Sequence, residues 1–154
     1  MAARIDILAV GGLSRDLRPA FDHYRRLLAP FCDLGVREVR EYVLHGRSSA
    51  EVLRDEGRRL LAAWPQRGIV VALAVEGRED ESPALASRLQ EWLQRGAVTF
   101  VVGGSLGLAP DVLDRAQESL SLSRLTLPHQ LARIVLAEQL FRAFKIARRE
   151  PYHH

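Results

Sequence analysis

The sequence predicts an α/β fold in which helices cover both faces of a parallel sheet. Short β-branched segments alternate with longer segments of helical periodicity, as they do in βαβ units. The segments 69–75 and 98–102 are apolar almost throughout, which is typical of strands buried on both faces. No linker, repeat or low-complexity segment interrupts the 154 residues, so residues 1–154 are predicted to form a single domain.

The first half of the chain is predicted to alternate two strands with two helices. The predicted elements are a strand over 5–10, a helix over 19–28, a weaker strand over 36–43 and a helix from 48 to about 64. The first helix places Phe21, Tyr24 and Leu28 on one face, which indicates that this face is buried. Ser48 is followed three residues later by Glu51, the spacing of a capping box at a helix start.

The second half continues the alternation and ends in a long helix. The predicted elements are a strand over 69–75, a helix over 82–94, a strand over 98–102, a helix from 110 to about 119, an extended segment over 119–128 and a helix from about 130 to 148. Polar and apolar residues alternate over 119–128, which suits an extended chain. The last helix is apolar over most of its circumference, so we expect it to be buried on several sides, including at a subunit interface.

The composition excludes several classes of protein. Hydrophobic residues make up 47% and charged residues 27% of the chain, which excludes a disordered protein. Cys32 has no cysteine partner, which excludes a disulfide-rich secreted scaffold. No apolar segment reaches the roughly 18 residues of a spanning helix, and no signal-peptide pattern opens the sequence. We therefore expect a cytoplasmic protein that makes no membrane contact.

The charge is mildly basic, with a net charge of +3 and a pI near 9.6. This excess is too small to establish a nucleic-acid partner. Lys145 is the only lysine, and arginine forks match phosphate groups better than lysine does, although a genome rich in arginine codons would give the same pattern. The five histidines are scattered without metal-ligand spacing, so no metal is expected.

Glycines mark the place where a ligand is expected. In a parallel sheet ligands bind beyond the carboxyl ends of the strands, and Gly11, Gly77 and Gly103 follow three predicted strands. The segment 103–107 matches neither a Walker loop nor a dinucleotide fingerprint, so it is either a ligand loop or a tight turn. The segment 119–128 offers backbone amides and carbonyls to a flat ligand, or else forms an ordinary edge strand.

The glycine loop also belongs to a wider pattern. It is followed by Leu-Ser-Arg-Leu-Thr-Leu-Pro-His at 122–129, then Arg133, Ala-Glu-Gln-Leu at 137–140, Arg142 and Pro-Tyr-His at 151–153. Over essentially the whole chain this pattern resembles the ribosomal RNA large subunit methyltransferase H family. These are small SPOUT-class enzymes that methylate N3 of a pseudouridine in 23S rRNA.

The resemblance implies a specific fold and cofactor. It implies a C-terminal trefoil knot, a homodimer formed through the last helix, and S-adenosylmethionine bound in the knot. The residues that it assigns to the cofactor are Leu73, Gly103, Gly104, Ser123, Arg124, Leu125, Thr126, Leu127 and Pro128.

The resemblance also implies a substrate, a pseudouridine of 23S rRNA in the assembled ribosome. Tyr152 and His153 are expected to shape the pocket for the base, with Arg142 helping to place it. Glu150 stands where the family usually has a histidine. Two alternatives are a SPOUT enzyme acting on another RNA, such as a tRNA, and a ribosome-binding relative without catalytic activity.

Overall fold

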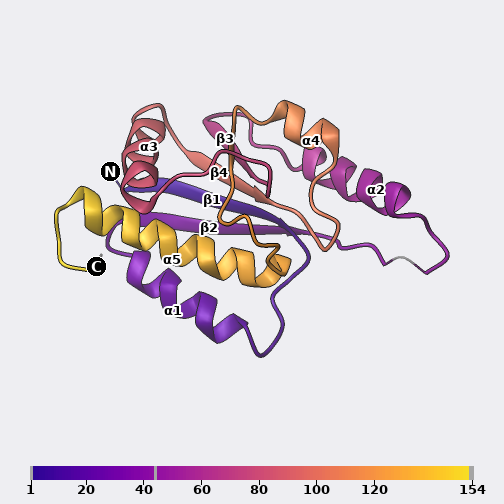
Figure 1. The fold of residues 1–154 in the computed structure, drawn as a ribbon, viewed down its shortest axis with the longest axis horizontal. Helices are drawn as coiled ribbons and strands as arrows, with labels where there is room; N and C mark the ends of the chain where they lie inside the picture. The colour runs from indigo at the N-terminus through magenta and orange to yellow at the C-terminus, as the bar shows by residue number, and fades with distance from the viewer. Residues whose placement is uncertain (1, 44, 153–154) are drawn as a thin grey trace.

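A computed structural model describes residues 2–43 and 45–152 and shows one parallel sheet flanked by helices (Figure 1). Its strands are β1 (Ala3–Val10), β2 (Cys32–Val39), β3 (Ile69–Leu73), β4 (Val98–Val102) and β5 (Glu118–Leu120). Its helices are α1 (Arg18–Leu28), α2 (Ser49–Ala62), α3 (Ser82–Gln94), α4 (Pro110–Arg115) and α5 (His129–Ala147). The strand order is β2-β1-β4-β3-β5 and every pairing is parallel, which confirms the predicted α/β class.

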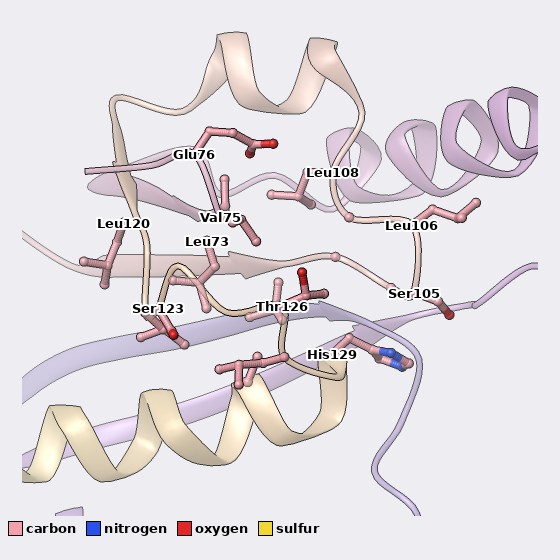
Figure 2. A pocket seen from close by; sticks show the side chains of 18 of the residues that line it. Leu73, Val75, Glu76, Ser105, Leu106, Leu108, Leu120, Ser123, Thr126 and His129 are labelled. Carbon is pink, nitrogen blue, oxygen red and sulfur yellow. The ribbon is translucent and has the colours of Figure 1, made fainter. Parts of the chain in front are cut away.

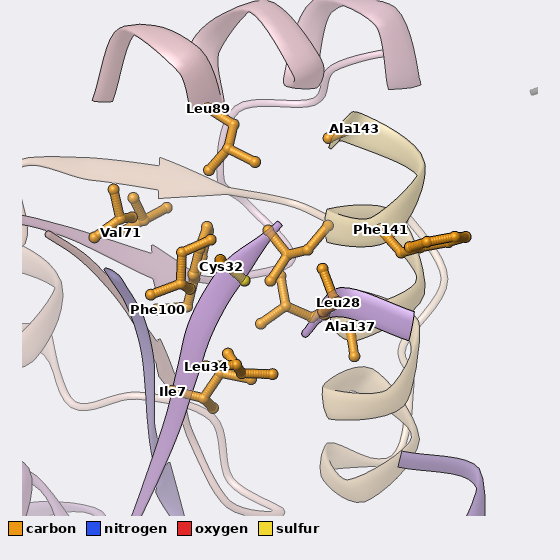
Figure 3. Packing of buried hydrophobic residues seen from close by; sticks show 14 of the residues in the cluster. Ile7, Leu28, Cys32, Leu34, Val71, Leu89, Phe100, Ala137, Phe141 and Ala143 are labelled. Atoms are coloured by element: carbon orange, nitrogen blue, oxygen red, sulfur yellow. The ribbon is translucent and has the colours of Figure 1, made fainter. Parts of the chain in front are cut away.

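Helices cover both faces of the sheet. On one face α1, α3 and α5 pack over alternate strand residues such as Ile7 and Phe100, as Figure 3 shows. On the other face α2 and α4 pack over the intervening residues, such as Leu8 and Val101. The central strand β4 is buried along its whole length, as its unbroken apolar sequence predicts.

Local signals explain where most helices begin. Prolines occupy the first turns of α1, α3 and α4, where the missing N–H costs nothing. The hydroxyl of Ser48 accepts a hydrogen bond of 3.1 Å from the backbone N–H of Glu51, which confirms the predicted cap of α2.

Several predicted boundaries are wrong. The second strand covers 32–39 rather than 36–43. The third strand ends at Leu73 rather than at 75, because the chain turns at 74–77. The helix predicted for 110–119 stops at Arg115, because Gln117 binds β3 instead: its N–H donates to the Val70 carbonyl, and its side-chain oxygen accepts from the Val70 N–H. Of the segment 119–128, only its first residues join a strand, β5.

Within a single chain, α5 is already largely buried between α1 and α3 (Figure 1). Its apolar character therefore does not by itself require a subunit interface. The stripe that stays partly exposed runs through Leu131, Val135, Glu138 and Arg142, spaced by three or four residues. The homodimer and the trefoil knot stay predictions. No helix of the described residues is long and apolar enough to cross a membrane.

Candidate functional site

A cavity of about 350 Å³ lies beyond the carboxyl ends of β3 and β4, where the glycines predict a site (Figure 2). Three chain segments wall it: 73–76 after β3, 102–108 after β4, and 120–127 leading into α5. Leucines, glycines and small hydroxyl side chains dominate the lining. The volume and the apolar lining are those of a small-molecule site.

The first and third walls are in direct backbone contact. The Ala74 N–H donates to the Leu120 carbonyl at 3.1 Å, and the Gly77 N–H closes the turn onto the Ala74 carbonyl at 2.9 Å. A Cβ on Gly77 would lie 2.9 Å from the carbonyl carbon of Leu120. Only glycine lets these two walls approach so closely.

The second wall is a glycine turn. Gly107 has a φ of +81°, and its N–H donates to the Gly104 carbonyl at 3.0 Å. A Cβ on Gly103 would collide with the carbonyl of Gly107. The segment 103–107 is thus a tight turn that also walls the cavity; the turn is confirmed, and its role as a ligand loop stays a prediction.

The third wall holds most of the predicted cofactor residues. The Ser123 hydroxyl accepts from the Leu125 N–H at 2.9 Å and so fixes the loop after Leu122. Seven of the nine predicted residues line the cavity, namely Leu73, Gly103, Gly104, Ser123, Leu125, Thr126 and Leu127. Arg124 instead faces solvent beside Glu79, and Pro128 caps α5 by accepting from the Ala132 N–H.

The cavity has few charged neighbours. Among the described residues that line it, Glu76 is the one carboxylate, and His129 lies at the other end of the cavity (Figure 2). Glu41 reaches toward this end, with its Oε1 3.8 Å from His129 Nε2 and 3.5 Å from the Ser105 hydroxyl. Sequence patterns gave no signal for Glu41, because no local spacing relates it to the glycine loop.

A buried carboxylate lies behind the glycine turn. Glu56 accepts a hydrogen bond of 3.2 Å from the Tyr42 N–H, and its Oε1 would lie 3.2 Å from a Cβ on Gly104. Burial raises the pKa of Glu56 above its ordinary value. Among the described residues, no group of three or more histidine, cysteine, aspartate or glutamate side chains could hold a metal ion.

The predicted catalytic residues form a separate cluster at the other end of α5. Glu138 Oε1 accepts from Arg142 Nη2 at 2.6 Å and from the Tyr152 hydroxyl at 3.2 Å, while the Arg142 guanidinium lies 4.8 Å from the centre of the Tyr152 ring. Burial and the Glu138 carboxylate raise the pKa of Tyr152. Sequence reasoning missed Glu138, although its i,i+4 spacing to Arg142 is a signal. His153 lies outside the described residues.

Glu150 has a structural partner in this tail. Its carboxylate lies 2.5 Å from Lys145 Nζ, and its N–H donates to the Lys145 carbonyl. The hydrogen bond from Lys145 lowers the pKa of Glu150. Glu150 therefore anchors the tail turn to α5.

Within one chain, the tail cluster and the cavity are far apart. Arg142 follows His129 by thirteen residues in one continuous helix, which separates them by roughly 20 Å along the helix axis. In Figure 1 the segment that follows α5 lies beside the end of that helix that is away from the loop over the cavity. The structure therefore brings the cofactor residues together, and Arg142 with Tyr152, but does not bring the two groups together.

Comparisons with known proteins bear on the family of this chain. A family model described as predicted SPOUT methyltransferase matches residues 3–153. A ribosomal RNA large subunit methyltransferase H from Bifidobacterium animalis is 45% identical, over 97% of this chain and 98% of the relative. A protein of the same description from Rubrobacter xylanophilus is 46% identical over 99% of both chains.

Two solved structures share the fold at low sequence identity. A probable methylase family protein from Haemophilus influenzae has a TM-score of 0.62 and 15% identity, over 100% of this chain and 72% of that chain. A probable methyltransferase from Bordetella pertussis has a TM-score of 0.59 and 14% identity, over 92% of this chain and 94% of that chain. The family model and the near-full-length relatives show that the chain belongs to the SPOUT methyltransferases, in the ribosomal RNA large subunit methyltransferase H family.

Proposed function

We propose that this protein transfers a methyl group from S-adenosylmethionine to N3 of a pseudouridine in the 23S rRNA of the assembled ribosome. The observation that carries the proposal is the cavity itself. Leu73, Gly104 and the loop 123–127 come from three distant parts of the sequence and line one hollow at the carboxyl ends of β3 and β4. These are the positions at which the family resemblance expects the cofactor.

The cavity fits a cofactor of this chemistry. Its glycine turn carries no side chain at Gly103, Gly104 and Gly107, so backbone atoms can lie against an adenine ring. Leu73 and Leu127 supply apolar contacts, while Ser123 and Thr126 supply hydroxyls. Glu76 gives the lining a negative charge that suits a cationic ligand. S-adenosylmethionine supplies an electrophilic methyl group on a sulfonium sulfur.

The tail cluster suits the nucleotide substrate. N3 of a uracil-type ring is an imide nitrogen, which must lose its proton before it attacks well. Arg142 can stabilise the resulting negative charge on the base, and Tyr152 offers a ring and a hydroxyl beside it. Glu138 holds both side chains in place. Positioning of these groups is expected to supply much of the rate enhancement.

A second copy of the chain would bring the tail cluster to the cavity. Because one straight helix separates the two groups, the tail of one copy can reach only the cavity of another. The partly exposed stripe of α5 from Leu131 to Arg142 is available for such a contact. We therefore propose a homodimer in which each active site combines one cavity with the other copy's tail.

The ribosome suits the weak charge of this protein. Proteins that grip free RNA rely on many phosphate contacts, whereas the net charge here is only +3. Of the arginines of α1, Arg18 and Arg25 donate to backbone carbonyls of their own chain. A folded ribonucleoprotein surface would supply contacts beyond those that this small net charge provides, and we propose that the reaction takes place in the cytoplasm.

The test is methyl transfer from labelled S-adenosylmethionine to three substrates that lack the modification: assembled ribosomes, isolated large subunits and tRNA. The proposal expects label in 23S rRNA from assembled ribosomes, in a nucleoside that mass spectrometry identifies as N3-methylpseudouridine. Label in tRNA alone would favour a different RNA substrate. Cofactor binding without transfer to any substrate would favour a non-catalytic ribosome-binding protein.

A further inference from the structure

A buried arginine lies beneath two walls of the cavity without lining it. Arg88, in α3, is 7% exposed, and its guanidinium lies 4.7 Å from the centre of the Trp92 ring. One arm of the guanidinium binds Asp80, whose side chain is also buried. The other arm lies 3.3 Å from Glu118. One cation therefore joins two carboxylates that are 38 positions apart in the sequence.

The two carboxylates belong to the roots of different walls. Asp80 comes four residues after Glu76, where the first wall ends, and Glu118 comes two residues before Leu120, where the third wall begins. Between these roots the walls run in register: the Ser121 N–H donates to the Arg78 carbonyl at 2.9 Å. The guanidinium thus closes the base of a two-stranded frame whose free end encloses the cavity.

We propose that Arg88 is a positioning residue that sets the spacing of the first and third walls and so the affinity for the cofactor. The proposal rests on the proposed function, because it takes the cavity as the S-adenosylmethionine site. A guanidinium is a rigid planar fork, so two carboxylates bound to it are held at a fixed separation. The buried Arg88 guanidinium also stays bound to both carboxylates, because losing either one would leave its positive charge poorly compensated and away from water.

A second ion pair joins the same two segments. Arg124 and Glu79 approach to 3.7 Å, but both side chains are exposed, and exposed pairs of this kind hold geometry weakly. Above the Arg88 cluster, backbone hydrogen bonds and the close packing of Gly77 on Leu120 continue the frame. A small change in the spacing of Asp80 and Glu118 would therefore shift residues that line the cavity.

The first test replaces Arg88 with methionine, which keeps the length and apolar stem of the side chain but removes the fork. We expect the Kd for S-adenosylmethionine, measured by calorimetry, to rise by about tenfold, and kcat at saturating cofactor to change little. Arg4→Met is the matched control. Arg4 also binds two carboxylates, Asp6 and Asp33, but on the β1–β2 side of the sheet, away from the cavity. The Kd of Arg4→Met for S-adenosylmethionine should therefore equal that of the wild type.

A second variant separates positioning from simple stability. Arg88→Met combined with Asp80→Asn and Glu118→Gln removes every charge of the cluster at once. Removing every charge of a cluster whose Arg88 and Asp80 side chains are buried often restores stability, so this variant should unfold near the wild-type temperature while its Kd for S-adenosylmethionine stays raised. If the Kd recovers together with the stability, Arg88 is only a structural residue and the inference is wrong.

Hydrogen exchange gives a reading that does not depend on the cofactor. The amides of Ala74 and Ser121, which donate across the two walls, should exchange faster in Arg88→Met than in Arg4→Met. Unchanged exchange would overturn the inference even if affinity fell. A wild-type protein that does not bind S-adenosylmethionine would instead overturn the proposed function, and the exchange rates would still decide the role of Arg88.

Discussion

The ion pair between Arg133 and Glu38 should respond unequally to the loss of either partner. Arg133 is 1% exposed, with Nη1 2.5 Å from Glu38 Oε2 and Nη2 2.8 Å from the Gly11 carbonyl. The Glu38 side chain is 36% exposed. Glu38→Ala leaves the buried Arg133 guanidinium without its carboxylate partner, so this substitution should lower the free energy of unfolding by about 3 kcal/mol. Arg133→Met lets Glu38 turn into water, so it should cost only about 1 kcal/mol.

Urea unfolding followed by tryptophan fluorescence measures both values. The double variant should cost about as much as Arg133→Met alone, because the carboxylate has no buried charge left to neutralise. Glu41→Ala is the matched control, since Glu41 makes only long contacts nearby, and it should cost under about 0.5 kcal/mol. The reasoning would be refuted if Arg133→Met proved as costly as Glu38→Ala.

Three further predictions concern the site and the core. Burial raises the pKa of Glu56, so wild-type stability should fall as pH rises above 4.5 through the folded pKa, and Glu56→Gln should raise the melting temperature at neutral pH but not in acid. Gly77→Ala places a Cβ 2.9 Å from Leu120, so it should weaken S-adenosylmethionine binding by about tenfold in calorimetry, whereas Gly12→Ala, with 3.6 Å of space, should not. Burial raises the pKa of Cys32 to about 11, so alkylation by iodoacetamide should be slow in the native protein and fast in urea; equal rates would contradict this.

The sheet and the location of the cavity could be predicted because their signals are local. The apolar segments at β3 and β4 identify buried parallel strands, and glycines at the strand ends identify where a ligand can approach. Gly103 and Gly77 illustrate this: a Cβ on Gly103 would meet the backbone of Gly107 in the same turn, and a Cβ on Gly77 would meet the backbone of Leu120 in another segment.

Other features depend on contacts between distant residues, which no local pattern encodes. The helix α4 ends before Gln117 because Gln117 hydrogen-bonds to both the N–H and the carbonyl of Val70, which lies in β3, about 47 positions earlier in the sequence. Arg88 reads as an ordinary helix-surface residue until Asp80 and Glu118 are brought to it by the fold. The separation of tail and cavity likewise follows from the length of α5, and it is the observation behind the proposed homodimer.

The most direct measurement uses mixtures of two inactive chains. Thr126→Trp fills the cavity of one chain, and Tyr152→Ala with Arg142→Ala removes the tail cluster of the other. If each site combines the cavity of one copy with the tail of another, refolding equal amounts together should restore about a quarter of wild-type methyl transfer, since half of the dimers are mixed and each mixed dimer has one intact site. A mixture as inactive as its two components would contradict the account.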